Sequence, residues 1–223
     1  MSTPIDGAII RIQRPEEYST RDKMRVKWYR ARRMCRFEIS SDSEECKIMN
    51  DDKHSYKDRK YNVIPYDSDW PEQFEEYASK IKNIFGDVQI EHIGSTAVPG
   101  MSGKPCIDVL VIVKDLKTAE RHIRDMEQAE FEYSGPFVTE DSRLFRLIKD
   151  NVLYANIHFF PIGHPHNNEM ISLRNYLRSH PEETKAYSNI KNELYSKYSN
   201  DYASYRKFKD EYMNDLMKRI MAA

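Results

Sequence analysis

Apolar residues gather in short runs across the middle of the chain, and these runs predict strands. The run at 106–113 is nearly continuous, which is typical of a strand buried on both faces of a sheet. The runs at 145–148 and 153–160 are separated by residues 149–151, whose Lys-Asp-Asn sequence favours a tight turn. The expected strands are residues 63–66, 88–93, 106–113, 145–148 and 153–160.

Between and after these runs, apolar residues recur every three or four positions, which is the helical period. Asp69 and Pro71 are suited to the cap and first turn of the first such segment, and Gly86 supplies its end. The expected helices are residues 69–85, 116–130, 169–178, 181–198 and 201 to the C-terminus. This order of elements predicts an α/β or α+β fold, in which helices flank a mixed β-sheet and a helical segment ends the chain.

Composition narrows the class of protein. With 39% hydrophobic residues, including 15 Tyr and 9 Phe, the 223-residue chain can build a real core. The 35 basic and 36 acidic residues nearly balance, so no global field calls for nucleic acid or an anionic membrane as partner. The sequence has no apolar run long enough to span a membrane and no signal-peptide pattern, and its three cysteines are widely spaced. We therefore expect a soluble cytoplasmic protein with reduced thiols and no membrane partner.

Residues 1–60 differ in character from the rest. Eight basic residues crowd positions 21–36, and polar, acidic residues follow at 40–45 and 50–53. We interpret this part as a basic arm with a polar linker, and we expect the main domain to be residues 61–223. The basic segment is either a solvated helix packed on the domain or a helix that binds RNA, phosphate or an acidic partner. Binding of nucleic acid is expected only through this arm.

The first candidate site is a Gly-Ser turn followed by an aspartate within an apolar strand. Gly94 and Ser95 end the predicted strand 88–93, and glycine lets the backbone approach a ligand so that successive amides can point at a phosphate. Thr96 extends this turn. In the next strand, alternation places Asp108 and Leu110 on one face. An aspartate inside an apolar strand is costly unless it is hydrogen-bonded, paired or metal-bound, so Asp108 is a catalytic and metal-binding candidate.

His158 is the second catalytic candidate. It shares a strand face with Asn156 and Phe160, and it is either a base, metal ligand or phosphate donor, or a hydrogen-bonded core histidine. His92 has the same ambiguity, and there we favour the structural role. The His164-Pro165-His166 sequence has no acidic or cysteine partner at ligand spacing, so we interpret it as a loop.

Cationic side chains near these candidates are suited to holding an anion. Guanidinium groups bind oxyanions through paired hydrogen bonds, and lysine supplies a point charge. The candidates are Lys104, Arg143, Arg146 and Arg174, with Arg178 one helical turn beyond Arg174 and more readily explained by surface salt bridging.

Several of these residues occur in a recognisable order. They are Pro65-Tyr66 with Trp70 and Phe74, the run from Glu91 to Met101, Lys104-Pro105 with Ile107-Asp108, Arg143 with Phe145, Asn156-Ile157-His158, and Arg174-x-Tyr176-Leu177-Arg178. This set resembles the GrpB (UPF0157) family, within the polymerase-β-like nucleotidyltransferase superfamily. The superfamily signature is an apolar residue, Gly-Ser, a gap, and then Asp-x-Asp or Asp-x-Glu. The resemblance covers about residues 63–221 and leaves the basic arm outside.

The resemblance implies a nucleotidyltransferase-like fold and a nucleotide ligand. Transfer chemistry of this kind uses two divalent ions held by carboxylates. Leu110 stands where the second carboxylate would be, and a replacement could come from Glu91, Glu140 or Asp141. A single, loosely held Mg²⁺, or no metal, is therefore expected.

Two hypotheses follow from this sequence. The first is a Mg²⁺-dependent nucleotidyl or phosphoryl transferase that binds a nucleotide or another phosphate-bearing molecule. The second is a catalytically reduced accessory or regulatory protein that binds a nucleotide or a coenzyme A precursor. Leu110 favours the second hypothesis.

Overall fold

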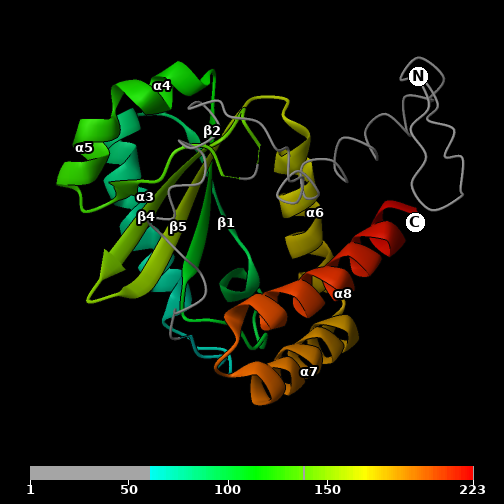
Figure 1. Ribbon diagram of the computed structural model, residues 1–223. Coiled ribbons are helices and arrows are strands. Elements are labelled where there is room, and N and C mark those ends of the chain that lie inside the picture. The colour runs from blue at the N-terminus through cyan, green and yellow to red at the C-terminus, as the bar shows by residue number, and fades with distance from the viewer. Residues whose placement is uncertain (1–60, 138, 223) are drawn as a thin grey trace, which may run out of the picture. The chain divides into compact units, whose positions relative to one another are not determined.

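The computed structural model describes residues 61–137 and 139–222, and the predicted basic arm lies outside them. The described chain combines helices with one sheet, as Figure 1 shows, and this confirms the predicted mixed α/β fold. Its elements are α3 (Trp70–Phe85), β1 (Gln89–Ile93), the 3₁₀ helix η4 (Ser95–Ala97), β2 (Ile107–Val113), α4 (Leu116–Arg121), α5 (Ile123–Gln128), β3 (Glu132–Tyr133), β4 (Arg143–Lys149), β5 (Val152–Pro161), α6 (Pro165–Ser179), α7 (Pro181–Tyr198) and α8 (Tyr202–Ala222).

The sheet has five strands in the order β1-β2-β5-β4-β3. The β2–β5 pair is parallel, whereas β1–β2, β4–β5 and β3–β4 are antiparallel. The parallel pair joins strands that are distant in sequence, and it sets Asp108 opposite Asn156 and Leu110 opposite His158. The sheet therefore brings the two candidate segments of the sequence side by side.

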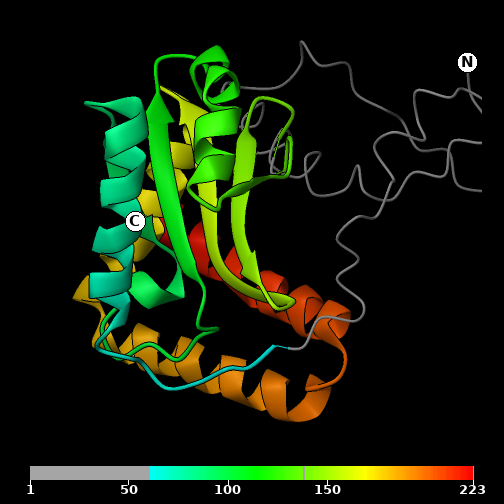
Figure 2. The same ribbon diagram turned by 90° about the vertical axis from the view of Figure 1, so that its left-hand side faces the viewer.

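One face of the sheet carries the main hydrophobic core. Its centre is made by Val109, Ile157 and Phe159, all of them fully buried, and α3, α4 and α5 pack over it. Figure 2 shows α3 running along this face, on the side away from α8. Because strand side chains alternate between faces, Asp108 and Leu110 necessarily point to the opposite face.

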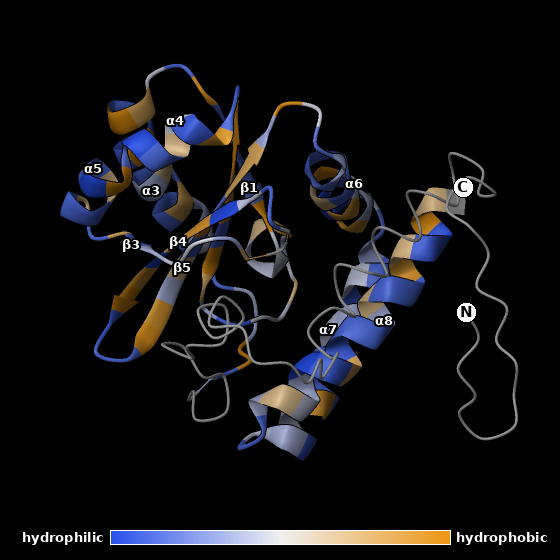
Figure 3. Cartoon of the chain, turned by 45° about the horizontal axis from the view of Figure 1, so that its top comes forward, coloured by the Kyte–Doolittle hydropathy of each residue, from blue (hydrophilic) through white to orange (hydrophobic). Residues whose placement is uncertain are grey.

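The opposite face is covered by α6 at one end. Met170 and Ile171 of α6 pack on Ile93, Leu110 and Phe160. Helices α7 and α8 then pack against α6 and the loop after η4 through a second apolar cluster, made by Val98, Met101, Leu177, Tyr187 and Leu216. In Figure 3 hydrophobic and hydrophilic colours alternate along α7 and α8, which is the pattern of their apolar stripes. No helix among the described residues combines the length and apolar composition that a membrane crossing requires.

The structure departs from the predicted elements in a few places. Residues 63–66 contribute only an isolated bridge between Ile64 and Gly103. The predicted helix 116–130 is two helices that meet at His122, and β3 was not predicted because two residues show no alternation. Helix α6 begins at Pro165 rather than at 169, because the His164 ring caps its first turn by accepting a hydrogen bond from the His166 amide. The interpretation of 164–166 as a loop was therefore wrong.

Candidate functional site

The Gly-Ser turn lies directly against the aspartate of β2. Ile93, the last residue of β1, is opposite Asp108 in the ladder, so the turn that follows passes over the Asp108 side chain. Gly94 has a φ of 75°, and a β-carbon at this position would collide with Oδ2 of Asp108. Glycine is required here twice over, for the backbone conformation and for the close approach. Ser95 then begins a helical turn, where the first N–H groups have no acceptor within the turn.

Asp108 is held by partners on the neighbouring strand. Asn156 donates from Nδ2 to Oδ1 of Asp108 at 2.9 Å, and Nε2 of His158 lies 3.8 Å from the same oxygen. Burial raises the pKa of Asp108, but the contacts with His158 and Asn156 together lower it by more, so that the net shift is downward. The carboxylate is therefore charged and oriented. The structure brings together the two residues predicted to be catalytic, Asp108 and His158.

A second carboxylate does not accompany Asp108. Leu110 is fully buried against Ile93 and Phe160, in the layer beneath α6. Among the described residues, no group of three or more His, Cys, Asp or Glu side chains is arranged to hold a metal ion. These donors do not fit a two-ion site. They could hold at most one Mg²⁺, for which Asp108 would be the protein carboxylate.

Glu91 and Arg174, predicted as a metal ligand and a phosphate ligand, form an ion pair with each other. Nη1 of Arg174 donates to Oε2 of Glu91 at 2.7 Å and to the carbonyl of His92 at 2.9 Å. Burial raises the pKa of Glu91, whereas hydrogen bonds from Arg174 and Gln89 lower it to a net downward shift. The pair fastens α6 to β1. Arg178, one turn later, donates from Nε to the carbonyl of Ala97 at 2.8 Å.

Arg143 and Arg146 point to opposite faces of the sheet. Arg143 is opposite Phe159 in the β4–β5 ladder and donates from Nε to Glu120 of α4 at 2.9 Å, on the face away from Asp108. Arg146 is opposite Asn156, on the same face as Asp108, where it is 4% exposed. Its guanidinium lies 5.1 Å from the ring of Phe137. Of these two predicted anion ligands, the structure places only Arg146 in the row that contains Asp108 and Asn156.

The remaining candidates near the turn are held by their neighbours. The Thr96 side chain is buried, and its Oγ1 lies 2.9 Å from Nε2 of His92, whose ring stacks on Phe74. Burial lowers the pKa of His92 to about 4. Lys104 donates from Nζ to the hydroxyl of Tyr202 at 2.6 Å, at the start of α8. His92 thus has the structural role that the sequence favoured, and Thr96 supports the turn from within.

The residue that sequence reasoning missed is Lys191. It lies on α7, is 1% exposed, and donates from Nζ to Oγ of Ser95 at 2.9 Å. The signal in the sequence is its position four residues after Tyr187 and three before Leu194, which places it beside the apolar stripe of the helix. A lysine within an apolar stripe indicates either a long side chain reaching the surface or a buried charge with a function.

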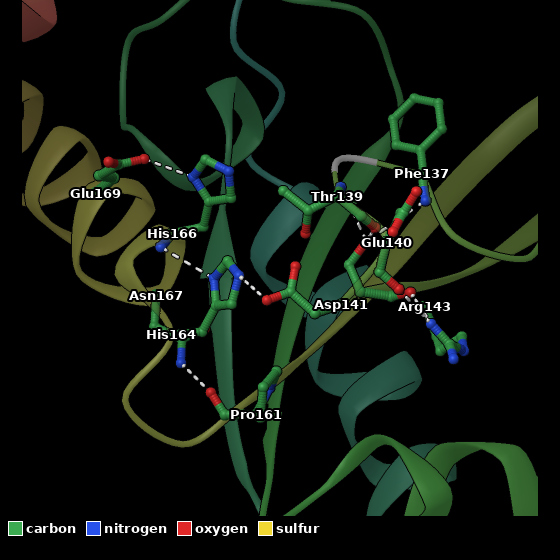
Figure 4. A network of polar contacts seen from close by, with 11 residues as sticks. Phe137, Thr139, Glu140, Asp141, Arg143, Pro161, His164, His166, Asn167 and Glu169 are labelled. Atoms are coloured by element: carbon green, nitrogen blue, oxygen red, sulfur yellow. Dashed lines mark hydrogen bonds and ion pairs between the residues drawn. The ribbon is translucent and has the colours of Figure 1, made fainter. Parts of the chain in front are cut away.

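A separate polar network lies where α6 begins, drawn in Figure 4. Nε2 of His164 is 3.3 Å from Oδ2 of Asp141, and Nδ1 of His166 is 2.5 Å from Oε2 of Glu169. Asp141, proposed from the sequence as a replacement carboxylate, is therefore paired here. Because Nδ1 of His164 accepts a hydrogen bond from the His166 amide, its Nε2 carries the proton and donates to Asp141. Glu140, the other such candidate, is exposed, and its carbonyl accepts from Arg143.

Comparison with known proteins identifies the family. The GrpB protein family matches residues 60–219, which is most of the chain. The chain belongs to the GrpB family. Among its relatives is the UPF0157 protein YqkA of Bacillus subtilis, 30% identical over 162 residues. That alignment covers 72% of this chain and 47% of YqkA, so the chain spans about half the length of this relative.

A solved structure of a GrpB protein agrees with this assignment. The crystal structure of the conserved GrpB protein from Enterococcus faecalis is 29% identical, with a TM-score of 0.68, and the match covers 72% of this chain and 98% of that one. A cytoplasmic RNA terminal U-transferase is more distantly similar, at 16% identity and a TM-score of 0.45, over 60% of this chain and 42% of that one. The GrpB structure shows the same fold as the described residues.

Proposed function

We propose that this GrpB-family protein binds the phosphate group of a nucleotide, or of another phosphate-bearing molecule, at the Gly94-Ser95 turn beside Asp108. The observation that carries the proposal is the close approach of Gly94 to the Asp108 carboxylate, which a β-carbon would prevent. A turn built in this way places backbone N–H groups and the Ser95 hydroxyl on one side of a bound anion. Gly94 is exposed and Ser95 is partly exposed, so a ligand can reach them.

The negative charge of Asp108 would allow the proposed site to bind a cation together with the phosphate. A carboxylate beside a phosphate repels it unless a cation lies between them. A bound Mg²⁺ would supply that cation and neutralise phosphate charge, with Asp108 as its ligand. Asn156 fixes the orientation of the Asp108 carboxylate through its hydrogen bond at 2.9 Å. Leu110 supports binding in preference to two-ion transfer chemistry, because it replaces a carboxylate with a core side chain.

Calorimetric titration with ATP tests the proposal. We expect the unmodified protein to bind, and Gly94→Ala to abolish binding by forcing the turn away from Asp108. Gly86→Ala is a matched control, since Gly86 also has a positive φ, 73°, but no atom within 4 Å of the position of a β-carbon. Equal affinity of the two variants would contradict the proposal, and titration with dephospho-coenzyme A extends the test to coenzyme A precursors.

The same titration with and without Mg²⁺ separates binding from transfer. If Mg²⁺ raises the affinity and Asp108→Asn removes that gain, Asp108 holds a metal, and release of pyrophosphate from ATP should then be measured. If neither change affects binding, the accessory function is favoured and transfer chemistry is not.

A further inference from the structure

Lys191 is a charged residue type in an apolar setting. Its side chain extends from α7 to Ser95, passes 4.5 Å from the centre of the Tyr187 ring, and is 1% exposed. The backbone of the 95–103 loop closes over it, because a β-carbon on Gly103 would lie 3.9 Å from Nζ of Lys191. Water therefore does not solvate this amine.

The described residues around Lys191 supply no counter-charge for it. Within the described residues, the Ser95 hydroxyl is its one hydrogen-bond acceptor, and no carboxylate lies within ion-pair distance of its Nζ. The groups that face it are Ser95 from η4, Tyr187 from α7 and Lys209 from α8, and Lys209 is itself paired with Asp210 at 3.0 Å. An ammonium group has three N–H donors, and burying it without a counter-charge is costly.

The protonation equilibrium of this amine is shifted by its surroundings. Burial lowers the pKa of Lys191 well below its usual range, and the nearby charge of Lys209 lowers it further. The neutral form of the amine is the one that suits the empty site. A neutral amine can donate to Ser95 at 2.9 Å and leaves no charge uncompensated.

We infer that Lys191 is the charge partner of the bound phosphate and that binding is accompanied by uptake of one proton from solvent onto its Nζ. This inference rests on the proposed function. The Ser95 hydroxyl accepts a hydrogen bond from Lys191 and belongs to the turn proposed to bind the phosphate. An anion bound at this turn would therefore supply the counter-charge that the buried amine lacks. No bond of the ligand is made or broken. The amine gains one proton, and the phosphate balances the ammonium charge across the Ser95 hydroxyl.

The inference specifies the ligand class and a pH dependence. A terminal phosphate, which carries more than one negative charge, satisfies both Lys191 and a cation at Asp108, whereas a neutral ligand satisfies neither. Because the amine is protonated in the complex and neutral in the free site, affinity falls as pH rises between the two pKa values. In that window the affinity decreases by about tenfold for each pH unit.

Titration calorimetry with ATP, at one pH in two buffers of different ionisation enthalpy, measures the number of protons taken up. We expect about one proton for the unmodified protein and none for Lys191→Met, with affinity reduced by about tenfold or more. Lys197→Met is the matched control, because Lys197 lies on the same helix, 5.2 Å from a tyrosine ring, but is exposed. This variant should keep both the affinity and the proton uptake.

The outcomes separate this inference from the proposed function. Binding by the unmodified protein without proton uptake overturns the inference and leaves the proposed function intact, and so does equal affinity of Lys191→Met. Absence of ATP binding by the unmodified protein, with and without Mg²⁺, defeats both. If Lys191→Met does not fold, the pH dependence of affinity in the unmodified protein decides, since an affinity that does not change with pH overturns the inference.

Discussion

At the residue scale, the proposed site combines the carboxylate of Asp108 with the buried amine of Lys191. Asp108 is stabilised as an anion by Asn156 and His158, whereas the hydrogen-bond acceptor of Lys191 among the described residues is the Ser95 hydroxyl. A buried amine without a counter-charge lowers the stability of the folded protein. Such a residue can be retained where a bound ligand supplies the missing charge, because the cost of burying the amine is then offset on binding.

Replacing this lysine should therefore stabilise the empty protein. We expect Lys191→Met to raise the free energy of unfolding by about 1 kcal/mol or more, since methionine fills the volume without a polar group. The folded-state pKa of Lys191 is lowered, so the unfolded state binds more protons and stability rises with pH through this window. The advantage of the variant should then increase as pH falls below about 10.5, the pKa of lysine in the unfolded state. Urea unfolding at several pH values measures it, and a less stable variant would contradict the prediction.

His92 provides a second pH dependence with the same sign. Its pKa is lowered from 6.5 to about 4 by burial, so the unfolded state takes up a proton between these values and the folded state does not. Stability should fall by up to about 3 kcal/mol as pH decreases from 6.5 to 4. His92→Gln, which keeps a donor for Thr96, should show a smaller loss over this range. Thermal unfolding across the pH range provides the measurement, and identical slopes for both proteins would count against it.

At the scale of elements, α6 is fastened to β1 by the buried pair of Arg174 and Glu91. We expect Arg174→Met to cost about 3 kcal/mol of stability, because it leaves a partly buried carboxylate without its partner. Arg219→Met is the control, since Arg219 pairs with Glu183 through two hydrogen bonds but is 53% exposed, and its loss should cost less than about 1 kcal/mol. Denaturant unfolding of both variants tests the difference, and equal costs would refute the role of Arg174 as a buried fastening.

The elements themselves were largely predictable from sequence. The apolar patterns gave β1, β2, β4, β5, α3, α7 and α8 nearly to their observed ends, because each element buries either a regularly spaced set of apolar side chains or, in β2, a nearly continuous run. The contact of Gly94 with Asp108 also followed from a turn and a strand close in sequence. The alternation of strand side chains that assigns Asp108 to one face of the sheet could also have assigned Arg143 to the other. It could not have predicted that Glu120 is the partner of Arg143.

Contacts between distant segments could not be predicted in this way. Lys191 reaches Ser95 across 96 residues, and no local pattern states which loop a helix will meet. Glu91 and Asp141 were plausible replacement carboxylates by sequence position, yet tertiary packing pairs them with Arg174 and His164. Local periodicity thus specified the elements, whereas the partners of charged side chains depended on how the layers assemble.

At the scale of the whole described chain, the packing of α6 on the sheet determines what a carboxylate at position 110 would meet. Leu110 is fully buried between the sheet and α6. We expect Leu110→Asp to lower stability by about 4 kcal/mol or more, and Mg²⁺ not to recover it, because the new charge would lie in an apolar layer. Leu110→Ala separates the cost of a cavity from that of a charge. Unfolding with and without Mg²⁺ measures both, and recovery by Mg²⁺ would show that a metal can enter.

The long span between Ser95 and Lys191 has a consequence for biosynthesis. A chain that emerges from the ribosome folds from its N-terminal side, and the sheet partner of Asp108 is made 48 residues after it. Lys191 follows later still, so the complete site that we propose would not exist on a nascent chain until α7 has been translated and docked. If the proposal holds, binding at full affinity would then report that α7 has docked.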